Sequence, residues 1–152
     1  MLNQNITIKI LPLLFILFVT GCGGIKVSGK VTFPDGSPLD TGKVTFESDQ
    51  NSFFGTIQKD GTFQLGRLKD GDGIIAGKYR VAVNASTPEV APNGFLISTT
   101  HFVAEKFRSP KTSGIEYDIQ KKTTNISIVV EPPKPGEEKQ IPLASPKLPK
   151  KK

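Results

Sequence analysis

The most restrictive feature of this sequence is a two-residue alternation of apolar and polar side chains that recurs through residues 25–131. Such alternation is typical of strands with one buried face, because successive side chains of a strand point to opposite sides. No stretch of eleven or more residues there carries a helical apolar stripe. The apolar positions define seven segments: Val27, Val31 and Phe33; Val44 and Phe46; Phe53 and Ile57; Phe63 and Leu65; Tyr79, Val81 and Val83; Ile115, Tyr117 and Ile119; Ile126, Ile128 and Val130.

Turn residues separate these segments. Asp35-Gly36 and Asp60-Gly61 suit tight hairpins, since both residue types tolerate positive φ. Many short strands joined by turns, without helices, favour a sandwich or a barrel. The length of the segment 25–131 is sufficient for one two-sheet core.

Residues 84–114 interrupt the alternation and contain three prolines, at positions 88, 92 and 110. Loops of this length inside a compact domain are usually functional or partly disordered. We therefore predict a long loop here, with a short edge strand at 95–100 and an irregular stretch over 106–114. Its aromatic and cationic side chains form a candidate interaction loop, namely Phe95, Phe102, Phe107 and Arg108.

The N-terminus resembles a bacterial lipoprotein signal. A polar start with Lys9 precedes an almost wholly apolar run over 10–19, which is too short to span a membrane. The sequence Val19-Thr20-Gly21-Cys22 then resembles a lipobox. This resemblance implies cleavage between Gly21 and Cys22, with diacylglycerol on the Cys22 thiol and an acyl chain such as palmitate on the new amine. The alternative is a plain secretory signal in which Cys22 is incidental.

With the strands assigned, residues 25–131 resemble a carboxypeptidase regulatory-like domain, which is a small transthyretin-like β-sandwich. The resemblance implies an all-β, single seven-stranded Greek-key sandwich outside the cytoplasm, and no catalysis. It depends on segments that occur in the family's order: 27–33 (VSGKVTF), 35–39 (DGSPL), 42–46 (GKVTF), 59–63 (KDGTF), 76–81 (AGKYRV) and 106–115 (KFRSPKTSGI).

Composition narrows the chemistry. The chain has one Cys and one His, which cannot form a disulfide, a usual zinc site or a catalytic dyad. We expect His101 to be a surface or edge-strand residue, with no catalytic residue, metal or cofactor. The segment Asp70–Gly73 lacks a Glu at the twelfth position of a calcium loop, so it is interpreted as a solvated turn.

The net charge of +6 resides mainly in the C-terminal segment, residues 132–152, which contains six Lys and six Pro. Residues 22–131 carry thirteen basic and twelve acidic side chains without a basic stripe, which argues against nucleic-acid binding. Such a tail cannot bury enough apolar area to fold alone, so we predict disorder. The alternative is a cationic arm that contacts anionic lipid, wall polymer or a protein.

These observations divide the chain into a signal peptide (1–21), a lipidated Cys and spacer (22–24), a β-sandwich (25–131) and a tail (132–152). We expect a non-enzymatic lipoprotein of the cell envelope, anchored in the outer membrane and facing periplasm or exterior. It would serve as a structural or interaction module for an envelope protein or glycan. The alternative is a carbohydrate- or solute-binding lipoprotein accessory to a transporter or enzyme.

Overall fold

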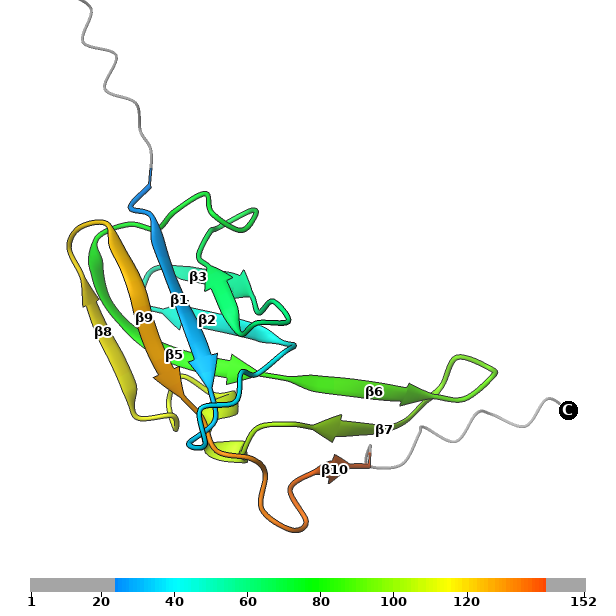
Figure 1. The fold of residues 1–152 in the computed structure, drawn as a ribbon. Helices are drawn as coiled ribbons and strands as arrows, with labels where there is room; N and C mark the ends of the chain where they lie inside the picture. Colours follow the sequence, from blue (N-terminus) through cyan, green and yellow to red (C-terminus); the bar gives the residue numbers. More distant parts are fainter. Residues whose placement is uncertain (1–23, 142–152) are drawn as a thin grey trace, which may run out of the picture.

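The structure is a computed structural model that describes residues 24–141. The predicted cleavage site at Gly21 and Cys22, and residues 142–152 of the tail, lie outside the described residues. Two sheets pack face to face, and a third, smaller sheet extends from them as an arm (Figure 1). The fold is therefore an all-β sandwich, as predicted from the alternation.

The larger sheet of the sandwich has four antiparallel strands in the order β3-β2-β5-β8, and the smaller has three in the order β4-β1-β9. Strand β1 pairs antiparallel with β4 but parallel with β9. All seven strands lie where the alternation predicts them: β1 (Val27–Thr32), β2 (Lys43–Glu47), β3 (Ser52–Thr56), β4 (Thr62–Gln64), β5 (Gly77–Asn84), β8 (Ile115–Ile119) and β9 (Thr123–Val129).

The apolar face of each sheet closes on the other. Phe46 of β2 lies near the centre, and its ring centroid is 6.4 Å from that of Phe63, 6.2 Å from Tyr79 and 5.8 Å from Tyr117. These rings come from both sheets, so aromatic contacts contribute to holding the two layers together. The fully buried side chains around them include Val31, Leu39, Val44, Leu65, Val81, Val83, Ile128 and Val130.

Strands β1 and β9 approach each other closely at Gly29. A Cβ atom on Gly29 would lie 2.3 Å from the Ile126 carbonyl oxygen and 2.8 Å from Phe63 Cζ. The register between the strands shifts here, and Asn125 adopts a positive φ of 70° beside the shift. This bulge lets β9 follow β1 after the shift, so glycine is needed for packing rather than for its φ.

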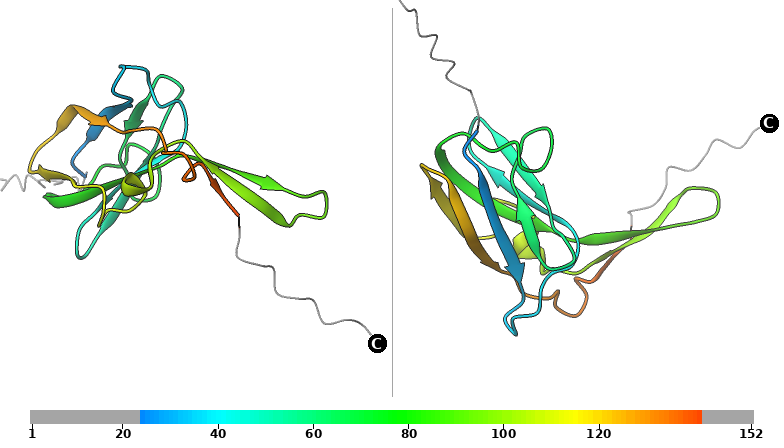
Figure 2. Two further views of the ribbon diagram at one scale, coloured as in Figure 1. Left: turned by 90° about the horizontal axis from the view of Figure 1, so that it is seen from below. Right: turned by 45° about the horizontal axis from the view of Figure 1, so that its top comes forward.

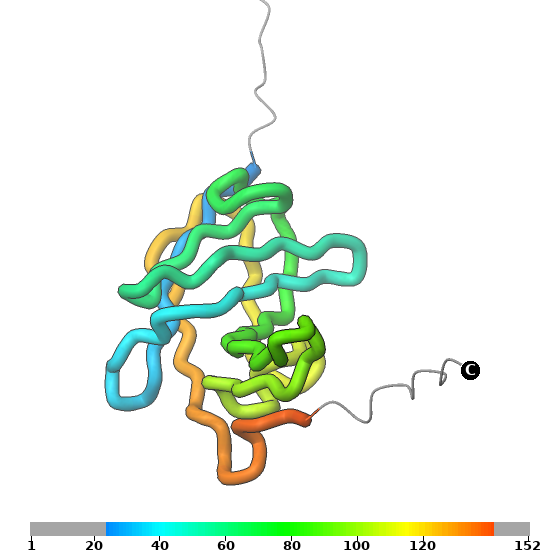
Figure 3. The backbone as a smooth tube through the Cα atoms, turned by 90° about the vertical axis from the view of Figure 1, so that its right-hand side faces the viewer, coloured from blue at the N-terminus to red at the C-terminus, as the bar shows by residue number. Residues whose placement is uncertain are grey.

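The prediction for residues 84–114 is wrong in part. Most of this segment is a hairpin of β6 (Ser86–Val90) and β7 (Leu96–His101), followed by the 3-10 turn η1 (Glu105–Arg108). Strand β7 confirms that a strand lies near residues 95–100, but it is the central strand of its sheet, between β6 and β10, and not the edge strand that was expected. Strand β6 was not anticipated. Figure 2 shows the hairpin projecting from the sandwich, and Figure 3 views the molecule along it.

The prediction of a disordered tail is wrong for its first ten residues. Residues 132–141 fold back along the base of the arm, where β10 (Lys139–Gln140) pairs antiparallel with β7. The composition of this segment, taken alone, predicted disorder because the segment has little apolar area to bury. Its backbone instead finds partners on a strand edge that the sandwich itself does not cover.

Gly29→Ala should lower the free energy of unfolding by about 2 kcal/mol or more, because the added methyl group meets backbone that cannot yield without separating β1 from β9. Urea unfolding of the two proteins measures this loss. Gly36→Ala is the control, since nothing lies within 4 Å of its Cβ and only its φ of 84° is strained. Its expected loss is about 1 kcal/mol. Equal losses at the two positions would refute the packing explanation.

Candidate functional site

The most distinctive surface feature is the arm, defined here as residues 86–101 with the short strand β10. Strand β5 leaves the sandwich through Ala85, which is fully buried, and continues as β6 (Figure 1). The arm is therefore the extension of a central core strand. Its direction is fixed by the pairing of β5 with β2 on one side and β8 on the other.

The tip of the arm is a tight turn over residues 91–95. The Ala91 N–H donates to the Phe95 carbonyl at 2.8 Å, and the Gly94 N–H donates to the Ala91 carbonyl at 2.8 Å. Asn93 Oδ1 accepts the Phe95 N–H at 3.2 Å, while Gly94 takes a φ of 83° that only glycine adopts freely. The turn closes the hairpin without help from a partner.

Arg108 fastens the base of the arm. Its guanidinium donates to the Val103 carbonyl from Nε at 3.0 Å and from a terminal nitrogen at 2.9 Å. It also donates to the Glu137 carbonyl at 2.9 Å. Val103 lies just after β7, and Glu137 lies just before β10. The Arg108 side chain therefore joins the two segments at the base of the arm.

The Glu137 carboxylate completes this fastening. It accepts the Glu105 N–H at 3.1 Å and the Lys134 N–H at 3.3 Å. The bond from Glu105, followed by the bond from Lys134 and the charges of Lys134 and Arg108, holds the pKa of Glu137 below its usual range. The base of the arm is thus stabilised by an ionised carboxylate.

A polar cluster spans the arm itself. The Ser98 hydroxyl of β7 donates to Glu89 Oε2 of β6 at 2.6 Å, and the Lys139 ammonium lies 3.1 Å from the same oxygen. The bond from Ser98 and then the interaction with Lys139 lower the pKa of Glu89. Side chains from all three strands therefore meet on one face, and Ser98 is fully buried beneath them.

Large apolar side chains remain exposed toward the tip. Phe95 exposes 54% of its surface, and its neighbours Leu96 and Ile97 expose nearly half of theirs. Val90 of β6 and Ile141 after β10 are more exposed still. Four large apolar residues exposed on the arm, with Ile141 directly after it, are unusual for a free surface and are typical of interaction sites.

The outer edge of β6 is protected against pairing with another strand. The Phe102 N–H donates to the Ala85 carbonyl at 2.9 Å, so the backbone groups of Ala85 point toward β7. In an antiparallel ladder every second residue points its backbone groups the same way, so the nitrogen of Pro88, three residues later, points away from β7. Proline has no N–H, so the outward row of donors is interrupted at its middle. The arm consequently offers its side chains rather than this edge to a partner.

The structure divides the four candidate loop residues into two pairs. Phe95 lies exposed at the tip, and Phe102 lies partly exposed at the base. Phe107 and Arg108 were assigned wrongly, because the Phe107 ring belongs to the core and the Arg108 guanidinium bonds backbone carbonyls. The sequence signal for the missed hairpin is Asn93-Gly94 between apolar residues, which is a strong turn signal.

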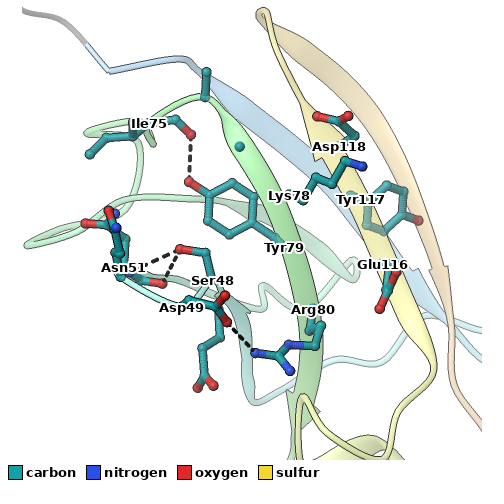
Figure 4. Close-up of a pocket in the computed structure, with 14 residues that line it drawn as sticks. Ser48, Asp49, Asn51, Ile75, Lys78, Tyr79, Arg80, Glu116, Tyr117 and Asp118 are labelled. Atoms are coloured by element: carbon teal, nitrogen blue, oxygen red, sulfur yellow. Dashed lines mark hydrogen bonds and ion pairs between the residues drawn. The ribbon is translucent and has the colours of Figure 1, made fainter.

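A groove of about 850 Å³ lies elsewhere, between the β2–β3 turn, the start of β5, and β8 (Figure 4). Cross-strand neighbours on its floor carry opposite charges, since Lys78 is paired in register with Asp118 and Arg80 with Glu116. The Tyr79 hydroxyl donates to the Ile75 carbonyl at 2.7 Å, and its ring is buried in the core. The lining as a whole carries four acidic and two basic side chains, so the groove is acidic, and the buried Tyr79 ring is not available for stacking.

The single imidazole, His101, lies in the arm at the end of β7 and is half-buried. The prediction of a surface or edge-strand residue is wrong about the edge, because β7 is the central strand of its sheet. The Nε2 atom of His101 is 3.3 Å from Gln140 Oε1, and its Nδ1 is buried without a hydrogen-bond partner in the described part of the chain. Between residues 24 and 141 no group of three or more His, Cys, Asp and Glu side chains is placed to hold a metal ion. Over the same residues, no helix has the length and apolar character needed to cross a membrane.

Comparison with protein-family models, with curated proteins and with solved structures found no match. The geometry of the arm is consequently the main guide to what this protein does. Its features are a rigid base, a closed tip, a protected edge and an exposed apolar surface.

Glu137→Gln should loosen the base of the arm at pH 7 and accelerate hydrogen exchange of the Glu105 amide several-fold. A carboxylate with a lowered pKa stabilises the fold above its unfolded pKa, near 4.5, and this stabilisation is lost as pH falls through the lower folded value. The difference between the two proteins should thus shrink as the pH falls below 4.5 and should vanish once the carboxylate is protonated in both the folded and the unfolded state. Glu138→Gln is the matched control, because Glu138 bonds the arm through its backbone carbonyl. A difference independent of pH would contradict the role of the ionised carboxylate.

Proposed function

We propose that this protein is a non-enzymatic lipoprotein of the cell envelope whose β-sandwich presents the arm to a protein partner. The single observation that carries the interaction role is the exposed apolar surface at residues 95–97, on a projection whose base is fastened by Arg108 and Glu137. A rigid projection loses little conformational entropy on binding, which favours recognition by its side chains.

The proposed location in the cell envelope depends on the N-terminal sequence. The apolar run over 10–19 followed by Val19-Thr20-Gly21-Cys22 supports lipidation of Cys22, and Cys22 is the single cysteine of the chain. The sandwich supports assignment to the carboxypeptidase regulatory-like domains, whose characteristic turns match Asp35-Gly36 and Asp60-Gly61. Both assignments favour a domain outside the cytoplasm, anchored in the outer membrane and facing periplasm or exterior.

The absence of catalysis is part of the proposal. One His and one Cys in the whole sequence provide few groups for acid–base or nucleophilic chemistry, and the Cys is assigned to the lipid. The carboxylates with lowered pKa values in and below the arm, Glu89 and Glu137, are engaged in structural bonds. These roles support a binding function over an enzymatic one.

Intact-mass analysis of the membrane-extracted protein tests the proposed location. We expect a chain that begins at Cys22 and carries the mass of a diacylglycerol and an additional acyl chain. Cys22→Ala should give an unacylated protein that remains in the soluble fraction or keeps residues 1–21. An unmodified wild-type chain that retains those residues would refute lipid anchoring.

A photo-crosslinking amino acid at position 95 tests the interaction role in intact cells. We expect one discrete adduct, since Phe95 lies at the exposed tip. The control position is Lys59, which is exposed in the turn between β3 and β4 and lies outside the arm. Ile97→Ser should weaken the adduct at 95 without lowering the unfolding midpoint appreciably. Adducts of equal yield at 59 and 95, or none at 95, would contradict the proposal.

A further inference from the structure

A second surface lies where the described chain begins. Residue Ile25 forms a two-bond bridge with Ile74, whose N–H and carbonyl lie 2.9 and 2.7 Å from their partners. The Thr123 N–H donates to the Lys26 carbonyl at 3.1 Å. Three segments therefore converge around the chain entry, and Figures 1 and 3 show them together at the end of the sandwich away from the arm. We call this surface the anchor end, comprising residues 24–26, 66–76 and 120–122.

The anchor end is basic. It carries five exposed cationic side chains and two acidic ones, whereas the rest of residues 24–131 carries eight basic and ten acidic side chains. Both acids are engaged locally, since Asp70 accepts the Thr56 N–H at 3.1 Å and Asp72 accepts the Lys69 N–H at 3.1 Å. The five cations are Lys26, Arg67, Lys69, Lys121 and Lys122.

Two large apolar side chains are exposed at the anchor end. Leu68 is 88% exposed between Arg67 and Lys69, and Ile75 is 53% exposed beside the bridge to Ile25. Leu68 is the most exposed of the large apolar residues in the described part of the chain. Apolar side chains surrounded by Lys and Arg are the pattern of surfaces that lie on anionic membranes, where the rings or alkyl groups enter the interface and the cations contact phosphate.

We propose that the anchor end binds anionic phospholipid headgroups, so that the domain stands on the membrane with its arm directed away from it. The inference rests on the lipid anchoring proposed above. Cys22 precedes Gly24 by two peptide units, which span at most about 7 Å. A lipid on Cys22 would therefore hold the anchor end close to the bilayer surface.

The charge of the anchor end determines which lipid it contacts. Each basic residue near a surface gains from the negative potential of anionic lipids within about one Debye length. Zwitterionic headgroups offer no such potential, so the contact should depend on anionic lipid and weaken as salt is added.

Single-tryptophan depth measurements test this orientation, since the sequence contains no Trp. The membrane-extracted, lipidated protein carrying Leu68→Trp is reconstituted into vesicles of phosphatidylcholine and phosphatidylglycerol that contain brominated acyl chains. We expect quenching of the indole in this variant to exceed that in the matched variant Phe95→Trp several-fold, because Phe95 is likewise exposed but lies on the arm. Both sites are exposed, so neither substitution disturbs the core.

The double variant Lys121→Glu, Lys122→Glu tests the electrostatic contribution to membrane contact. In the Leu68→Trp background this pair should reduce quenching at least about two-fold, as should replacing phosphatidylglycerol with phosphatidylcholine. The matched control is Lys59→Glu with Lys111→Glu, two exposed lysines outside the anchor end, which should leave quenching unchanged.

Vesicle flotation of the same samples separates the two proposals. Protein that floats with the vesicles while the Leu68→Trp and Phe95→Trp variants are quenched equally would overturn the orientation and leave lipid anchoring intact. Protein that does not float would overturn the anchoring itself. Strong quenching at position 68 that is insensitive to lipid charge, salt and the lysine pair would overturn the assignment of anionic headgroups.

Discussion

The continuity of β5 with β6 is the constraint on which the rest of the structure depends. Within the sandwich, β5 pairs with β2 and β8 and buries Tyr79, Val81 and Val83. At Ala85 the same strand leaves the core and becomes one side of the arm. Because a strand paired on both sides cannot rotate freely, the core that stabilises the sandwich also sets the direction of the arm.

The arm itself lacks a hydrophobic core, and a two-stranded hairpin alone is marginal in water. Polar bonds provide what apolar burial cannot: Arg108 and Glu137 fasten the base, and Glu89 joins β6 to β7 and β10. These interactions consume backbone and charged groups and leave the apolar side chains near Phe95 free. Stability and binding thus use different atoms of the same hairpin.

The sandwich could be predicted from sequence because each of its seven strands buries one face, and one-sided burial requires apolar residues at every second position. Strand β6 could not, since all five of its residues are exposed and Pro88 lies at its centre. Strand β10 has two residues, which is too few for any period. Phe107 and Arg108 were misassigned because a four-residue 3-10 turn has no periodicity that distinguishes a core ring or a structural cation from exposed ones.

Both ends of a sandwich can be altered without touching the core, and here the two ends differ in chemistry. The anchor end carries Lys and Arg on both sides of Leu68, whereas at the opposite end β5 continues into the arm, which has an apolar tip. Strand β1 alone spans about 20 Å between these ends, several times the reach of the tether that the proposed lipid would provide. An anchored domain with so short a tether cannot invert, so the apolar residues of the arm would face away from the anchoring bilayer. Their exposure is then better explained by a protein partner than by the lipid that holds the chain.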